Sequence, residues 1–142
     1  MLVKSVMSRN VQYVKPQQTI QEAAQMMSAF DVGMLPVIDS LNALLGTITD
    51  RDIAVNCVAR GYNPQTTRVA DGMSKNAVTC SINDDVTEAM QLMKSHQIRR
   101  LIVLDNSFQT VGILSLGDLA TRYGEERKVE RVLQKVSEHR LH

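Results

Sequence analysis

Two short stretches of the sequence place a hydroxyl residue three positions before an aspartate, at the end of an apolar run. They read GTITDRDIA from residue 46 and GILSLGDLA from residue 112. A hydroxyl can donate a hydrogen bond to a phosphate, and an ionised carboxylate accepts two hydrogen bonds at once from the vicinal hydroxyls of a ribose. The pairs Thr49 with Asp52 and Ser115 with Asp118 therefore have the chemistry of a site for a nucleoside phosphate.

The same spacing is also typical of a helix start. Each hydroxyl residue lies where an apolar run is expected to become a helix, whose free N–H groups suit either an anion or an N-cap with an acid at N3. Asp is shorter than the Glu or Gln of the usual capping box, and the chain has Glu in two other capping signatures, Thr19-x-x-Glu22 and Asp85-x-x-Glu88. From the spacing alone, a capping role and a ligand-binding role are equally well supported.

The two stretches differ in the basic side chains that could pair with a phosphate. Arg99 and Arg100 precede the apolar run that leads towards Ser115, whereas Gly33 and Met34 stand at the matching positions of the first stretch. Paired arginines before a strand usually mark a solvated strand end. Beside a motif suited to phosphate, bidentate contact by arginine becomes the better interpretation. The first stretch offers Arg51 within its own motif instead.

The two stretches belong to a long internal duplication. Residues 7–54 align with residues 73–120 without a gap, at a constant offset of 66. Each copy predicts, in order, a short β-prone run, a capped amphipathic helix, a hairpin of two apolar strands and a second helix. The β-prone runs are residues 11–14 and 77–80, and the second helices are residues 50–60 and 116–123, each followed by a glycine. A gapless match of this length indicates two copies of one β-α-β-β-α unit.

A unit of this size buries too little surface to be stable alone. We therefore predict an α/β (α+β) fold in which two sheets pack face to face about a pseudo-twofold axis, with helices outside. The predicted segments are a first repeat (1–62), a linker (63–68), a second repeat (69–124) and a C-terminal amphipathic helix (125–142). That last helix carries an apolar stripe that packs on its own domain or on a symmetry mate, or serves as a groove-binding helix for another protein. The stripe consists of Val129, Val132, Leu133 and Val136.

Composition argues against several classes of protein. The 142 residues carry 16 Lys and Arg against 15 Asp and Glu, which gives no field for nucleic acid or for acidic membranes. No spanning segment or secretory h-region is apparent, so we expect a cytoplasmic protein. Cys57 and Cys80 lack metal-ligand spacing and are expected to be buried thiols. No catalytic triad or P-loop pattern is present, so we expect neither an enzyme nor a metal site.

These motifs resemble those of the cystathionine β-synthase (CBS) domain family. The resemblance rests on the gapless duplication, on the LPVID segment and on both Gly-x-x-[Ser/Thr]-x-x-Asp motifs, and it covers residues 2–123. The second copy departs from the family pattern at Ile102, which replaces the proline usual at this position. The first copy keeps that proline as Pro36. The resemblance is specifically to small stand-alone bacterial CBS-pair proteins.

The resemblance implies a regulatory module that binds an adenosine-containing ligand in clefts between the repeats, often as a homodimer of CBS pairs. It assigns ribose and phosphate contacts to the hydroxyl and aspartate of each motif, phosphate contacts to the arginines, and adenine contacts to residues near the first strand of each copy. The expected site residues are Ser115, Asp118, Arg99, Arg100, Val78 and Thr79 in the second copy, and Thr49, Asp52, Arg51, Gln12 and Tyr13 in the first.

Because the first copy lacks the arginine pair, we expect the second site to be the stronger one. The expected ligand is AMP, ADP or ATP as a regulatory ligand, with NAD or S-adenosylmethionine ranked below them and no cofactor required. A further partner would be an unidentified regulated protein. The alternative function is an interaction or dimerisation module that needs no ligand.

Overall fold

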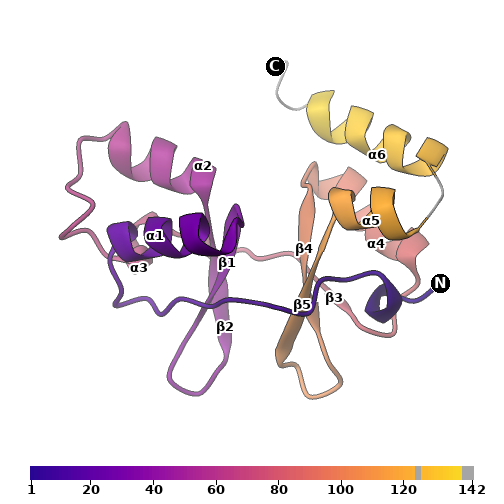
Figure 1. Ribbon diagram of the computed structural model, residues 1–142, viewed down its shortest axis with the longest axis horizontal. Helices are drawn as coiled ribbons and strands as arrows, with labels where there is room; N and C mark the ends of the chain where they lie inside the picture. The colour runs from indigo at the N-terminus through magenta and orange to yellow at the C-terminus, as the bar shows by residue number, and fades with distance from the viewer. Residues whose placement is uncertain (124–125, 139–142) are drawn as a thin grey trace. The chain divides into compact units, whose positions relative to one another are not determined.

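The computed structural model describes residues 1–123 and 126–138 of the chain. The chain divides into two compact units, and one of them combines two segments that are separate in the sequence. The first-copy unit is Gln12–Ala77, and the second-copy unit combines Met1–Val11 with Val78–His142. Each unit is mixed α and β, as the sequence predicts (Figure 1).

The first-copy unit contains one hairpin and its covering helices. Its elements are α1 (Ile20–Phe30), β1 (Met34–Ile38), β2 (Leu44–Thr49), α2 (Asp50–Asp52), the π-helical turns η2 (Ile53–Val58) and α3 (Val69–Gly72). All of β1 is buried. The core joins the apolar face of α1 to the inner side chains of the hairpin, among them Ile20, Leu35 and Ile48.

The second-copy unit repeats this plan and adds helices at both ends of the chain. Its elements are η1 (Val3–Ser5, a 3-10 helix), β3 (Thr79–Ser81), α4 (Val86–His96), β4 (Arg100–Leu104), β5 (Thr110–Ser115), α5 (Leu116–Arg122) and α6 (Glu126–Glu138). The three strands form one sheet in the order β3-β4-β5, with β3 parallel and β5 antiparallel to β4.

Local sequence signals place the first helix of each copy correctly. Thr19 caps α1, because its side chain accepts a hydrogen bond from the N–H of Glu22, and Asp85 caps α4 by accepting from the N–H of Thr87. The antiparallel hairpins β1-β2 and β4-β5 also lie where the apolar runs predict them.

The second helix of the first copy departs from the predicted continuous helix over 50–60. It begins at Asp50 as expected, but after Asp52 the backbone widens into π-helical turns, with Ala59 N–H donating to the Ala54 carbonyl at 2.9 Å. Gly61 ends this segment with φ of 75°, a conformation that glycine adopts without strain. The glycine after α5, Gly124, lies outside the described residues.

The β-prone run of the first copy forms less structure than that of the second. In the second copy the N–H of Ile102 donates to the Val78 carbonyl at 3.2 Å, and β3 pairs with β4 over three residues. Pro36 occupies the position of Ile102 in the first copy and has no N–H to donate. The corresponding pairing is reduced to one parallel bridge between Val14 and Val37.

Each copy is bordered by a segment that precedes the other copy along the chain. We name these the N-terminal strap (residues 2–8) and the middle strap (residues 68–74). The N-terminal strap packs in the second-copy unit, where it begins with a bridge from Leu2 to Asp85, and the middle strap packs in the first-copy unit, where Arg68 bridges to Thr19. The duplication therefore includes the straps. Each strap comes directly before one copy in the sequence but packs in the unit of the other copy.

The C-terminal helix α6 packs on α4 and α5 of its own unit (Figure 1). Val129, Val132 and Val136 are buried in the core of that unit, whereas Leu133 remains 42% exposed. Three of the four residues of the predicted stripe thus pack on their own domain. Within residues 1–123 and 126–138, no helix has the length and apolar character needed to cross a membrane.

Candidate functional site

Both hydroxyl and aspartate pairs form complete capping boxes. In the second copy, Ser115 Oγ accepts from the N–H of Asp118 at 3.0 Å, and the N–H of Ser115 donates to Asp118 Oδ2 at 3.0 Å. In the first copy, Thr49 and Asp52 exchange the same two hydrogen bonds at 3.0 and 2.9 Å. The expectation that Asp is too short to reach back was wrong, because in both copies its Oδ2 lies within hydrogen-bond distance of the N–H of the capping residue.

A capping role does not use all the acceptors of these carboxylates. An ionised carboxylate has about four lone-pair positions, and the box occupies one of them on Oδ2. Asp118 is nevertheless well covered, with its side chain 13% exposed, and Ser115 is half-buried. The motif therefore both starts α5 and presents further acceptor positions at one fixed place.

The arginine pair lies directly beside the motif of the second copy. Arg100 stands opposite Ser115 in the β4–β5 ladder, and the carbonyl of Arg99 accepts a hydrogen bond of 3.0 Å from the N–H of Leu116. Both arginines are half-buried, and the buried Nε of Arg99 has no hydrogen-bond partner among residues 1–123 and 126–138. The backbones of both arginines thus adjoin the residues that start α5.

The residues expected near adenine lie on the opposite side of β4. Thr79 pairs with Ile102, and the Val78 carbonyl accepts from the N–H of Ile102, two residues along the strand from Arg100. Val78 and Thr79 are both half-buried. The structure therefore brings the expected second-copy residues to neighbouring strands of one three-stranded sheet.

The first copy arranges its motif in the same way but supplies fewer cations. Met34 stands opposite Thr49, and the carbonyl of Gly33 accepts from the N–H of Asp50 at 3.0 Å, so uncharged residues occupy the places of the arginines. Arg51 is exposed. Gln12 and Tyr13 are half-buried just before the bridge at Val14, and burial raises the pKa of the Tyr13 phenol.

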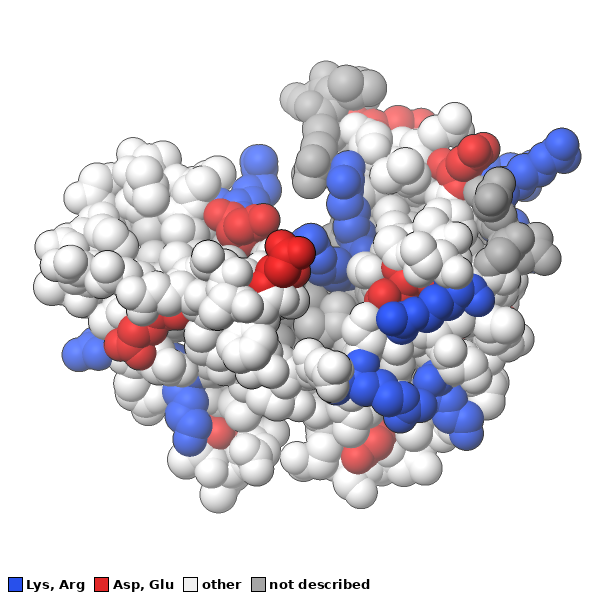
Figure 2. Space-filling view, in the orientation of Figure 1, with Lys and Arg blue, Asp and Glu red and all other residues white. Residues whose placement is uncertain are grey.

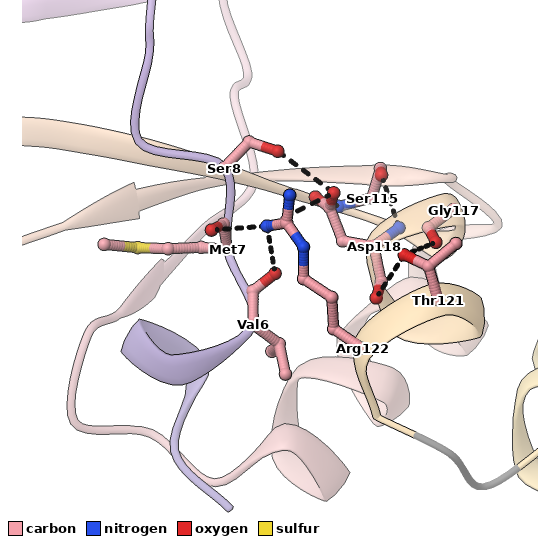
Figure 3. A network of polar contacts seen from close by, with 8 residues as sticks. All are labelled: Val6, Met7, Ser8, Ser115, Gly117, Asp118, Thr121 and Arg122. Carbon is pink, nitrogen blue, oxygen red and sulfur yellow. Dashed lines mark hydrogen bonds and ion pairs between the residues drawn. The ribbon is translucent and has the colours of Figure 1, made fainter.

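The straps add residues that the sequence analysis missed. Ser8 of the N-terminal strap donates a hydrogen bond to Asp118 Oδ1 at 3.0 Å, and Ser74 of the middle strap donates to Asp52 Oδ1 at 3.4 Å (Figure 3 shows the second-copy contacts). The identity of Met-Ser-x-Asn at residues 7–10 and 73–76 was the available signal. It marks a repeated position without indicating which copy the serine contacts.

The two units differ slightly in charge. The second-copy unit contains 11 of the 16 Lys and Arg residues and nine of the 15 Asp and Glu residues, so its formal charge is +2, whereas that of the first-copy unit is −1. Figure 2 shows acidic and basic side chains interspersed on the face that it draws, with several basic ones close together. In the part of the chain that the structure describes, no cluster of His, Cys, Asp and Glu has the makings of a metal site.

Comparison with known proteins agrees with this architecture. The family model of the CBS domain matches residues 3–57 and 68–125. The CBS domain-containing protein YhcV of Bacillus subtilis is 41% identical over 140 residues, which cover 99% of this chain and 98% of the relative. The conserved CBS domain protein TA0289 of Thermoplasma acidophilum has a similar fold, with a TM-score of 0.85 at 24% identity over 95% of this chain and 75% of its own.

A third similar protein has been solved with ligands. The CBS domain pair of protein MJ0100, in complex with 5′-methylthioadenosine and S-adenosyl-L-methionine, has a TM-score of 0.79 and 25% identity. The match covers 89% of this chain and 98% of that structure. With both repeats matched by the family model and a 41% identical relative of the same length, the chain belongs to the CBS domain family, as a regulatory CBS pair.

Proposed function

We propose that this CBS pair senses an adenine nucleotide, AMP, ADP or ATP, and that it does so without catalysis. The observation that carries this proposal is the placement of Arg100 opposite Ser115, one turn from Asp118. It supplies a phosphate partner and a ribose acceptor side by side. NAD and S-adenosylmethionine are the secondary candidates.

Each second-copy residue has a distinct role in this proposal. Arg99 and Arg100 pair with phosphate oxygens, and the buried Nε of Arg99 gains a hydrogen-bond acceptor, which it lacks among the described residues. Asp118 accepts from the ribose hydroxyls, and Val78 and Thr79 border the adenine. An adenosine ligand is further supported by the methylthioadenosine and S-adenosylmethionine bound to the similar protein MJ0100.

The first copy forms a weaker site in this proposal. Thr49 and Asp52 keep the ribose chemistry, with Gln12 and Tyr13 near the adenine, but Gly33 and Met34 contribute no positive charge beside the phosphate. Arg51 is the cation within that motif, and its exposure leaves it more strongly screened by solvent. Occupancy of the second site is therefore expected at lower nucleotide concentrations.

A thermal-shift screen tests the proposed function. The panel contains AMP, ADP, ATP, NAD, S-adenosylmethionine and 5′-methylthioadenosine, with guanosine nucleotides as matched controls. A ligand present at about 100 times its Kd adds about 2.7 kcal/mol to the free energy of unfolding, which is a melting shift of about 2–8 °C. A protein whose melting temperature does not respond to any adenosine compound at millimolar concentration would contradict the proposal. Release of phosphate from ATP during prolonged incubation would contradict the non-catalytic part.

A further inference from the structure

In each unit, a serine of the strap and the residue four positions after the motif aspartate both contact that aspartate, and the latter residue also donates to backbone carbonyls of the strap. In the second-copy unit, Ser8 donates to Asp118 Oδ1, and Arg122 Nη1 lies 3.9 Å from the same oxygen while donating to the carbonyls of Val6 and Met7 at 3.1 and 3.0 Å (Figure 3). The strap is thus fixed both to the carboxylate and to the helix that carries it.

The first-copy unit repeats this arrangement with weaker groups. Asn56 stands at the position of Arg122, and its Nδ2 donates to the Gly72 carbonyl at 3.3 Å and to Asp52 Oδ1 at 3.5 Å. The hydroxyl of Ser74 lies 3.4 Å from Asp52 Oδ1, against 3.0 Å for Ser8 and Asp118. The contacts that reach the middle strap itself are neutral and 3.3–3.4 Å long, whereas Arg122 and Ser8 hold the N-terminal strap at 3.0–3.1 Å.

The glycine of each motif makes this docking possible. Ser8 and Ile113 exchange two backbone hydrogen bonds of 2.9 and 3.0 Å, next to Gly112. A Cβ atom at Gly112 would lie 2.9 Å from the Ser8 carbonyl oxygen, and one at Gly46 would lie 2.1 Å from the Ser74 carbonyl oxygen. The motif therefore requires glycine for the approach of a strap, and the hydroxyl of that strap arrives at the aspartate as a result.

Ser8 completes the orientation of the Asp118 carboxylate. The N–H of Ser115 fixes Oδ2, and the Ser8 hydroxyl fixes Oδ1, so rotation of the carboxylate about χ2 would break at least one hydrogen bond. Two vicinal hydroxyls can donate to both oxygens at once only if the carboxylate plane is held in one orientation. Preorganisation of a binding group in this way lowers the cost of binding.

We infer that Ser8 is a positioning residue for ribose recognition at Asp118, through which the N-terminal strap sets the preference for ribose over 2′-deoxyribose. The inference rests on the proposed function, because it requires a nucleotide at the second-copy site. By linkage, a ribonucleotide that binds the fixed carboxylate more tightly also strengthens docking of the strap.

Binding measurements with paired sugars test this inference. Calorimetric titrations of AMP, 2′-deoxy-AMP, ATP and 2′-deoxy-ATP are made on the wild type and on Ser8→Ala. We expect Ser8→Ala to weaken each ribonucleotide about three- to tenfold while changing its deoxy counterpart little, so that the ribose preference narrows. Ser8→Thr, which keeps the hydroxyl, should restore the preference. Ser5→Ala is the matched control, since Ser5 is an exposed serine of the same strap.

The outcomes separate this inference from the proposed function. An unchanged ribose preference in a folded Ser8→Ala variant that still binds AMP or ATP would overturn the inference alone. If neither AMP nor ATP binds the wild type, the inference is overturned. The proposed function is contradicted only if none of the adenosine compounds in the thermal-shift screen binds either.

A second measurement covers the case in which Ser8→Ala does not fold. Hydrogen exchange of the Ser8 and Ile113 amides is followed in the wild-type protein with and without AMP or ATP. The inference predicts slower exchange of both amides with the ribonucleotide, and a smaller effect with the deoxynucleotide at equal site occupancy. Equal protection by the two sugars would overturn it.

Discussion

Arg100 lies directly opposite Ser115 in the antiparallel β4–β5 ladder, so the two side chains leave the same face of the sheet where β5 ends and α5 begins. Gly33 and Met34 take the places of the two arginines in the other copy, with Met34 opposite Thr49. The two copies therefore share a ribose-type motif and differ in the positive charge that accompanies it.

Replacing both arginines should change affinity according to the number of phosphates. We expect Arg99→Ala with Arg100→Ala to weaken ATP most, ADP less and AMP least, because each further phosphate loses a bidentate partner. Adenosine serves as the control ligand and should bind the variant almost as it binds the wild type. Calorimetric titration of the four ligands makes the comparison. Equal weakening of all four would show that the arginines support the fold rather than the phosphates.

Glycine at position 112 should be required for docking of the N-terminal strap. In Gly112→Ala the new Cβ would lie 2.7 Å from Met7 Sδ and 2.9 Å from the Ser8 carbonyl oxygen, an overpacking that costs about 1–3 kcal/mol. Urea unfolding measures the loss, and hydrogen exchange at Ser8 locates it. Gly117→Ala is the control, because its nearest neighbour would be Ser115 Oγ at 3.5 Å, an ordinary contact. Equal stabilities of the two variants would contradict this explanation of the motif glycine.

The C-terminal helix should stabilise its own unit through its valines. Val132 is fully buried, and Val132→Ala should lower the free energy of unfolding by about 1.5–3 kcal/mol, as measured in urea. Leu133→Ala is the matched control: its side chain is 42% exposed, and its effect should stay within about 0.5 kcal/mol. The mass of both variants in solution is measured alongside. A Val132→Ala variant that keeps its stability but loses self-association would place the stripe at an interface between chains.

The thiol of Cys80 should resist alkylation in the native protein. Burial, with a smaller contribution from Asp84, raises its pKa from 9.0 to about 12. Its contribution to stability is therefore fully present below pH 9 and is lost as the pH rises towards 12, because the unfolded thiol ionises first. Iodoacetamide at about pH 8 should label Cys80 rapidly in urea and slowly without it, as peptide mapping would show. Equal rates would contradict the burial of this thiol.

Local sequence rules predicted the elements of this fold because short-range hydrogen bonds determine them. The caps at Thr19 and Asp85, and the strands of both hairpins, depend on residues within a few positions of each other. The β-prone run at residues 11–14 was predicted to match that at residues 77–80, but Pro36 has no N–H to donate, and beside the β1–β2 hairpin this run forms only one bridge.

The contacts of the straps could not be predicted in the same way. Ser8 and Asp118 are 110 residues apart, and the alignment of the copies pairs Ser8 with Ser74 without indicating that each serine docks on the other copy. Whether an Asp can close a capping box depends on the backbone at the start of α5, which spacing alone does not specify. The motif residues were therefore identified from sequence, and their partners required the structure.

Calorimetric titration of AMP, ADP and ATP into Asp118→Ala and Asp52→Ala tests the central claim most directly. Each substitution removes an equivalent capping carboxylate, so each is the control for the structural effect of the other, and thermal denaturation verifies that both fold. We predict that Asp118→Ala weakens binding about ten- to a hundredfold through the loss of charge-assisted hydrogen bonds to the ribose, while Asp52→Ala has a smaller effect. Loss of binding in Asp52→Ala with binding intact in Asp118→Ala would place the working site in the first copy. Unchanged binding in both would show that the two aspartates serve to start helices.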